Sequence, residues 1–159
     1  MTNVELKYVE KNTLSTESPY ECIVSHKIQL HHSTVSGLGV FARDKIIENE
    51  LIERFPLVPL TWRARYVGDP MIWRHIIPSS QDCKCSDCKN HGLLLNLCLG
   101  YGAVYNHQDE PNAVFKINHE KLYVDVIALK DISVDSEIFV SYGDNFNPPE
   151  GKVIVKNNE

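Results

Sequence analysis

Three cysteines and one histidine lie within nine residues of one another, at Cys83, Cys85, Cys88 and His91. Thiolate and imidazole groups are the ligands of structural zinc sites, where four of them surround the ion as a tetrahedron. The set predicts one structural zinc, with Cys98 as the alternative to His91 in the fourth position. The single residue between Cys83 and Cys85 is a closer spacing than zinc-binding pairs usually have, so the competing interpretation is a loop with free thiols.

Three further segments carry residues that suit a binding or catalytic site. In Gly37-Leu38-Gly39 the missing side chains allow close approach of a ligand to the backbone, or simply a hairpin turn. Asn106-His107 is either a ligand contact or a buried polar pair that ties two loops together. Tyr142 ends an expected strand, where a tyrosine most often packs on the core. Each segment alone is ambiguous.

Taken together and in this order, Ser36–Ala42, Tyr101–Asn112 and Glu137–Asp144 resemble the SET-domain protein-lysine methyltransferases, particularly the compact viral and bacterial members. The Asn-His pair, a Pro-Asn pair four residues later, and a strand ending in Tyr-Gly form the most specific part of the pattern. The resemblance runs from about Leu30 to Phe146. It implies a mainly β fold with few short helices, the SET-domain β-clip architecture, in which the C-terminal segment threads beneath the Asn-His loop in a knot-like crossing.

The resemblance also implies an activity and a role for each motif. The chain would transfer a methyl group from S-adenosylmethionine to a lysine side chain of a basic protein such as a histone. Tyr142 would be the catalytic residue, with its hydroxyl beside the methyl group and the lysine nitrogen. The implied cofactor-binding residues are Gly37, Leu38, Gly39, Tyr105, Asn106 and His107, with the Asn106 side chain at the methionyl end and the His107 backbone at the adenine.

Methyl transfer requires a neutral lysine nitrogen, although a free lysine has a pKa near 10.4. A narrow apolar channel and the neighbouring sulfonium of the cofactor both disfavour the ammonium form, so a strong general base is not required. Phe115, Val140 and Phe146 are the candidate residues of this lysine channel. The resemblance implies that a tyrosine hydroxyl in the channel holds a water and limits transfer, so these residues, which lack hydroxyl groups, favour di- or trimethylation, although Phe115 is equally a candidate core residue.

The elements that must position these residues are mostly short strands. Residues 113–117 and 122–129 flank a polar turn and predict a β-hairpin, and 50–53 and 57–60 predict two strands separated by a proline. We expect an N-terminal arm over 1–19, the SET domain over 20–146, and a tail over 147–159. Within the domain, residues 61–97 form a variable insert that contains the cysteine cluster.

The formal net charge of −5 argues against direct nucleic-acid binding and is compatible with a basic protein or peptide partner. No apolar run approaches the ~20 residues that span a bilayer, and the N-terminus lacks the apolar core of a signal peptide. An intracellular location follows, in cytoplasm or nucleus, or in a host cell if a pathogen secretes the protein. The alternative function is a non-catalytic SET-like module that binds a peptide or partner and holds a structural zinc.

Overall fold

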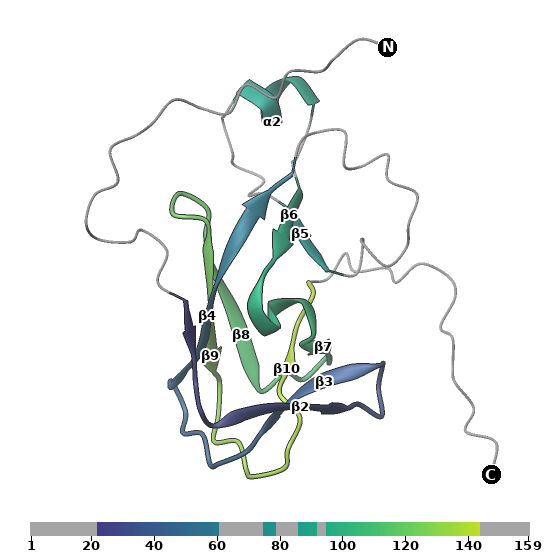
Figure 1. Cartoon of the computed structure of the whole chain (residues 1–159), viewed down its shortest axis with the longest axis vertical. Helices are drawn as coiled ribbons and strands as arrows, with labels where there is room; N and C mark the ends of the chain where they lie inside the picture. Colours follow the sequence, from purple (N-terminus) through teal and green to yellow (C-terminus); the bar gives the residue numbers. More distant parts are fainter. Residues whose placement is uncertain (1–21, 61–74, 79–85, 92–94, 144–159) are drawn as a thin grey trace, which may run out of the picture.

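The computed structural model of the chain describes residues 22–60, 75–78, 86–91 and 95–143. Within these ranges the chain is mainly β-strand, with one short α-helix and one 3₁₀ turn (Figure 1). The described elements are β1 (Ile23–Val24), β2 (Ile28–His32), β3 (Leu38–Ala42), β4 (Leu51–Pro59), β5 (Ile76–Pro78), α2 (Ser86–His91), β6 (Leu95–Cys98), η2 (Gly100–Ala103), β7 (Asn106–His107), β8 (Ala113–Asn118), β9 (Tyr123–Ala128) and β10 (Phe139–Val140). The predicted mainly β fold class is confirmed.

Strand β4 is the central strand of the largest sheet, whose order is β5-β6-β4-β9-β8, with β1 also paired to β4. The prediction of two separate strands at 50–53 and 57–60 was wrong, since β4 continues through Pro56. This proline lies where β4 changes neighbours, because Leu51 to Pro56 pair with β9 and Leu57 to Pro59 pair with β6. A proline at such a transition interrupts neither ladder in its middle.

The predicted hairpin over the second half of the chain is confirmed by β8 and β9, which pair antiparallel from Ala113 opposite Ala128 to Asn118 opposite Tyr123. Alternate residues of β9 are buried, as expected for a strand with one face on the core. The turn is closed by the Lys121 N–H, which donates to Asn118 Oδ1 at 2.8 Å.

Two small two-stranded sheets complete the fold. Strands β2 and β3 pair antiparallel and cross the lower part of the molecule in Figure 1, while β7 and β10 pair parallel. The expected strand over 137–142 is shorter than predicted, because Glu137 bridges Phe41 instead of extending β10. The β7–β10 pair sets Asn106 opposite Phe139, and so brings the Asn-His segment beside the strand that leads to Tyr142.

The core lies between the large sheet and these small sheets. Its largest fully buried apolar side chains are Tyr105, Phe55, Ile46, Ile52, Ile138, Val40, Val124, Val126 and Val140. No helix of the described residues is long and apolar enough to cross a membrane. The predicted arm (1–19) and tail (147–159) lie outside the described residues, as does most of the insert, so the domain boundaries and the knot-like threading stay predictions.

Candidate functional site

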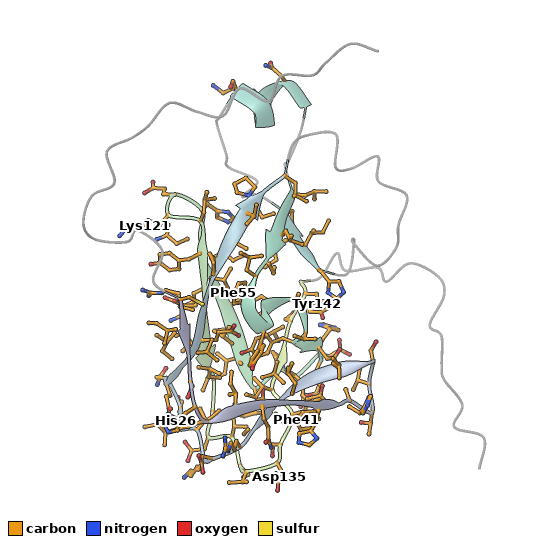
Figure 2. The ribbon with its side chains drawn as sticks, viewed as in Figure 1. His26, Phe41, Phe55, Lys121, Asp135 and Tyr142 are labelled. Atoms are coloured by element: carbon orange, nitrogen blue, oxygen red, sulfur yellow. The ribbon has the colours of Figure 1, made fainter. Side chains whose placement is uncertain are left out.

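Tyr142 follows β10 and is held by two hydrogen bonds to β7 and the residue before it. Its hydroxyl donates to the Tyr105 carbonyl at 2.5 Å, and its main-chain N–H donates to His107 Nδ1 at 3.1 Å. Figure 2 shows Tyr142 at the end of β10, near η2. The residue as a whole is 38% exposed, which leaves part of it open to a ligand although its hydroxyl is engaged.

The environment of the Tyr142 hydroxyl keeps the phenol neutral. Burial, with smaller contributions from Cys98 and Glu137, raises the pKa of Tyr142 to about 12. An ionised phenol would place a negative charge against the Tyr105 carbonyl oxygen, which can only accept hydrogen bonds. At neutral pH this side chain is therefore a hydrogen-bonded phenol and not a base.

The side chain of His107 has a role that the sequence did not indicate. Because Nδ1 accepts the Tyr142 N–H, the ring proton must reside on Nε2, which lies 3.2 Å from Asp109 Oδ1 and donates to it. The His107 and Tyr142 rings also lie against each other, with centroids 5.4 Å apart. The imidazole thus orients the main chain at Tyr142.

Asn106 connects the glycine segment to the C-terminal strand. Its side-chain nitrogen donates to the carbonyl oxygens of Ser36 at 3.2 Å and Leu38 at 3.1 Å, and to Glu137 Oε1 at 2.7 Å. All three partners are acceptors, which fixes the orientation of the amide and turns Oδ1 away from them. Asn106 therefore holds the Gly37-Leu38-Gly39 backbone in place beside β7.

Gly37 and Gly39 suit their positions for different physical reasons. Gly37 has φ +52°, a left-handed conformation, and a Cβ there would meet no atom within 4 Å. A Cβ on Gly39 would overlap Glu137 Oε1 and lie 3.2 Å from Asn106 Nδ2. Gly37 thus leaves open space at the turn, whereas Gly39 permits close packing of β3 on the Asn106–Glu137 pair.

Two further polar residues fix the segment from which Tyr142 extends. Asn112 donates to the Glu137 carbonyl at 2.9 Å and accepts from the Phe139 N–H at 2.8 Å, as a neighbouring strand would. Glu137 is only 9% exposed, and its second oxygen accepts from the Ser33 hydroxyl at 2.8 Å. Glu137 therefore connects Ser33 and Asn106 to the segment that leads to Tyr142.

A second buried carboxylate, Glu53 of β4, was not indicated by the sequence. Its oxygens accept from the Tyr101 N–H at 2.8 Å and from the Tyr105 hydroxyl at 2.9 Å. Burial raises the pKa of Glu53 above its ordinary value, and the same burial raises the pKa of Tyr105. Only the burial of position 53 would have revealed this residue, because its neighbours in sequence are ordinary strand residues.

The structure describes two of the three predicted channel residues, Phe115 and Val140. Phe115 packs edge-on against Phe55 and Tyr105, with ring centroids 5.6 and 5.7 Å apart, and Val140 is fully buried. Phe115 is thus partly buried against the core beside Tyr105, and Val140 is a core residue opposite His107 in the β7–β10 pair. Phe146 lies outside the described residues, and the lining of a lysine channel stays a prediction.

The predicted zinc ligands lie mostly beyond what the structure describes. Cys83 and Cys85 lie outside the described residues, and Cys88 and His91 belong to α2, but their side chains are not among those described. Among the described side chains, no group of three or more possible metal ligands occurs. Cys98 is buried, and burial raises the pKa of its thiol to about 12.

Comparison with known protein families identifies the family of this chain. Residues 37–143 match the SET domain family model, which spans the glycine segment, the Asn-His pair and Tyr142. The chain belongs to the SET domain family.

Proteins similar to this chain include two histone-lysine methyltransferases and one candidate histone methyltransferase. A histone-lysine N-methyltransferase of Schizosaccharomyces pombe, specific for lysine 37 of histone H3, is 24% identical over 123 residues, which are 77% of this chain and 78% of that protein. The crystal structure of a Plasmodium falciparum protein, described as a candidate histone methyltransferase, is similar at a TM-score of 0.57 with 30% identity, over 77% of this chain and 98% of that chain. The Neurospora SET domain protein DIM-5, a histone lysine methyltransferase, shares the fold at a TM-score of 0.55 with 16% identity, over 76% of this chain and 53% of that chain.

Proposed function

We propose that this chain is a protein-lysine N-methyltransferase that takes its methyl group from S-adenosylmethionine and transfers it to a lysine of a basic protein such as a histone. The observation that carries the proposal is the placement of the Tyr142 hydroxyl, which donates to the Tyr105 carbonyl directly beside the Asn106-His107 pair. Family membership and the activities of the relatives support the same reaction class.

The Tyr142 hydroxyl suits the acceptor side of a methyl transfer. Its single hydrogen is donated to the Tyr105 carbonyl, so toward the reacting groups the hydroxyl oxygen can act only as an acceptor. An oxygen in that state can attract the polarised methyl group through weak C–H···O contacts. It does not donate to the lysine nitrogen, whose lone pair must stay free to attack the methyl carbon.

The cofactor supplies an electrophilic methyl group on a sulfonium, and the described residues fit such a ligand. The open space beside Gly37 leaves room for it next to the backbone, and the Asn106 amide is already fixed by its three acceptors. Its carbonyl oxygen would accept from the methionyl ammonium. The Leu38 and Gly39 backbone and the His107 and Tyr105 main chain would complete the cofactor contacts.

The net charge of the chain and the substrate of one relative support a basic acceptor. With a formal net charge of −5 the chain would attract a Lys- or Arg-rich segment, and the S. pombe relative acts on histone H3. The acceptor lysine would lose its proton as it leaves water and approaches the sulfonium. A histone acceptor would place the activity in the nucleus or cytoplasm.

A structural zinc bound by Cys83, Cys85, Cys88 and His91 belongs to the same proposal. The donor set is chemically adequate for zinc, and Cys98 remains the alternative to His91 in the fourth position. The ion would tie down the insert and leave the methyl transfer itself to the residues around Tyr142.

A single experiment tests the reaction class. The purified chain is incubated with a mixture of core histones, ribosomal proteins and an acidic control protein in the presence of S-adenosylmethionine carrying a deuterated methyl group. Mass spectrometry should find the label on lysine nitrogens of the basic proteins, and the labelled peptides give the methylation state. Label on other atoms, or on the acidic protein equally, would contradict the proposal. Absence of label together with cofactor binding would favour the non-catalytic binding module.

A further inference from the structure

Burial of the Glu53 carboxylate destabilises the folded protein by more than the surrounding contacts stabilise it. Its side chain is 0% exposed in the central strand, between Val24 on β1 and Val126 on β9. Among the described residues no basic side chain pairs with it. An apolar residue of similar size would normally stabilise such a position better than a buried charge does. A reason other than stability is therefore expected for this residue.

Both side-chain hydrogen-bond partners of Glu53 belong to the segment 101–105, which ends at the reaction site. One oxygen accepts from the Tyr101 N–H at the start of the segment, and the other accepts from the Tyr105 hydroxyl at its end. Gly100 lets this segment approach, because a Cβ there would lie 2.5 Å from Glu53 Oε1. The carboxylate thus spans the segment from a rigid central strand.

The Tyr105 residue has two distinct partners. Its hydroxyl is held by Glu53, and its ring is 1% exposed and packs edge-on against Phe115. Its carbonyl oxygen accepts the Tyr142 hydroxyl. Because the ring is held at its hydroxyl by Glu53 and packed against Phe115, the main chain of Tyr105 cannot turn without breaking one of these contacts.

We propose that Glu53 is a positioning residue, which fixes Tyr101 and Tyr105 so that the Tyr105 carbonyl points at the Tyr142 hydroxyl. This inference rests on the proposed function, since the direction of that hydroxyl matters only if it faces the transferred methyl group. Displacing the carbonyl would let the hydroxyl rotate and turn its hydrogen toward the lysine lone pair.

Two conservative variants test the inference in the full chain. Glu53→Gln keeps the shape and can still accept from Tyr101, while Tyr105→Phe removes the hydroxyl that Glu53 holds and leaves the ring. Each variant should lower kcat about 10-fold, because small misplacements of a reacting group are costly, while the KM for the cofactor changes by less than about threefold. Ile132→Val is the control, since Ile132 is a core residue that bridges Ile46, away from the site.

A second readout does not depend on catalysis. The protein is prepared with 3-fluorotyrosine, and the ¹⁹F resonance of Tyr142 is assigned from the Tyr142→Phe variant. The Tyr142 resonance should shift in Glu53→Gln and in Tyr105→Phe but not in Ile132→Val. An inactive wild-type protein with these shifts would refute the proposed function and leave the positioning role intact.

Other outcomes overturn the inference. Wild-type kcat and an unmoved Tyr142 resonance in both folded variants would show that Glu53 does not act on Tyr142. Failure of both variants to fold, while Ile132→Val folds, would make Glu53 a residue of stability alone. A rise in the cofactor KM with unchanged kcat would assign it to binding instead.

Discussion

Replacing Gly39 by alanine should uncouple the glycine segment from the C-terminal strand. The new methyl group would overlap Glu137 Oε1 and lie 2.8 Å from Glu137 Cδ. The carboxylate must then move away from Asn106, to which it is bonded at 2.7 Å, or from Ser33 at 2.8 Å. The substitution therefore affects a buried polar junction, although it adds only one carbon.

The expected loss in the free energy of unfolding of Gly39→Ala follows from two effects. Overpacking a closely packed site costs about 1–3 kcal/mol, and losing a hydrogen bond to a charged group costs about 1.5–3 kcal/mol. The stiffer unfolded chain offsets about 0.4–1 kcal/mol of this. The net expectation for Gly39→Ala is a loss of about 1.5–5.5 kcal/mol in the free energy of unfolding. Cofactor affinity should fall as well, because the Leu38 carbonyl loses its fixed partner.

Gly37→Ala is the matched control two residues away. Its Cβ would meet no atom within 4 Å, so the cost is limited to the left-handed backbone at φ +52°, roughly 1–2 kcal/mol. Urea denaturation and calorimetric titration with S-adenosylmethionine measure both effects. Removing the obstructing carboxylate with Glu137→Ala should make the Gly39→Ala cost smaller, giving a coupling of about 1 kcal/mol or more in a double-mutant cycle. A Gly39→Ala protein as stable as wild type, or fully additive effects, would refute this reasoning.

Three other predictions follow from separate features of the molecule. His107→Ala should lower kcat about 10-fold by freeing the Tyr142 main chain, whereas His107→Asn keeps an acceptor near Nδ1 and should stay within about threefold of wild type; equal losses in steady-state assays would remove the anchoring role. The Lys27 hydrogen bond is the main cause that lowers the pKa of Glu50, so this stability is present above pH ~4.5 and lost as pH falls through the folded-state pKa. Between about pH 5 and 3 the free energy of unfolding, measured by urea denaturation, should therefore fall less for Lys27→Met than for wild type, with a difference of about 1 kcal/mol or less. An equal fall in the two proteins would contradict the assignment. Elemental analysis should find one zinc per chain that is lost in Cys83→Ser, and a metal-free wild type would leave the free-thiol loop as the correct interpretation.

The parts of the fold that could be predicted from sequence are those with local causes. The hairpin of β8 and β9 follows from alternation on both sides of a polar turn at Asn118. Asn106, His107 and Tyr142 were found because their spacing forms a recognisable pattern, and the structure brings all three together through the β7–β10 pair. The strand prediction was wrong at Pro56, because β4 can contain a proline at the position where it changes neighbours.

The remaining site residues depend on contacts between distant parts of the chain. Glu53 meets the Tyr105 hydroxyl across 52 positions, and Glu137 meets the Ser33 hydroxyl across 104. A glutamate in a strand is ordinarily read as a solvent-facing charge, and only the packed sheet reveals that both carboxylates are buried. The anchoring role of the His107 side chain could not be predicted either, because its partner is a backbone N–H, which leaves no signature in the sequence.

The most direct test of the account compares wild type with Tyr142→Phe in two measurements on the same preparations. One is the single-turnover rate of methyl transfer to a histone peptide, and the other is the dissociation constant for S-adenosylmethionine. Tyr142→Phe should bind the cofactor within about threefold of wild type and transfer the methyl group roughly 100-fold more slowly, because it loses only the oxygen at the reacting carbon. Methyl transfer by Tyr142→Phe at the wild-type rate would contradict the central claim.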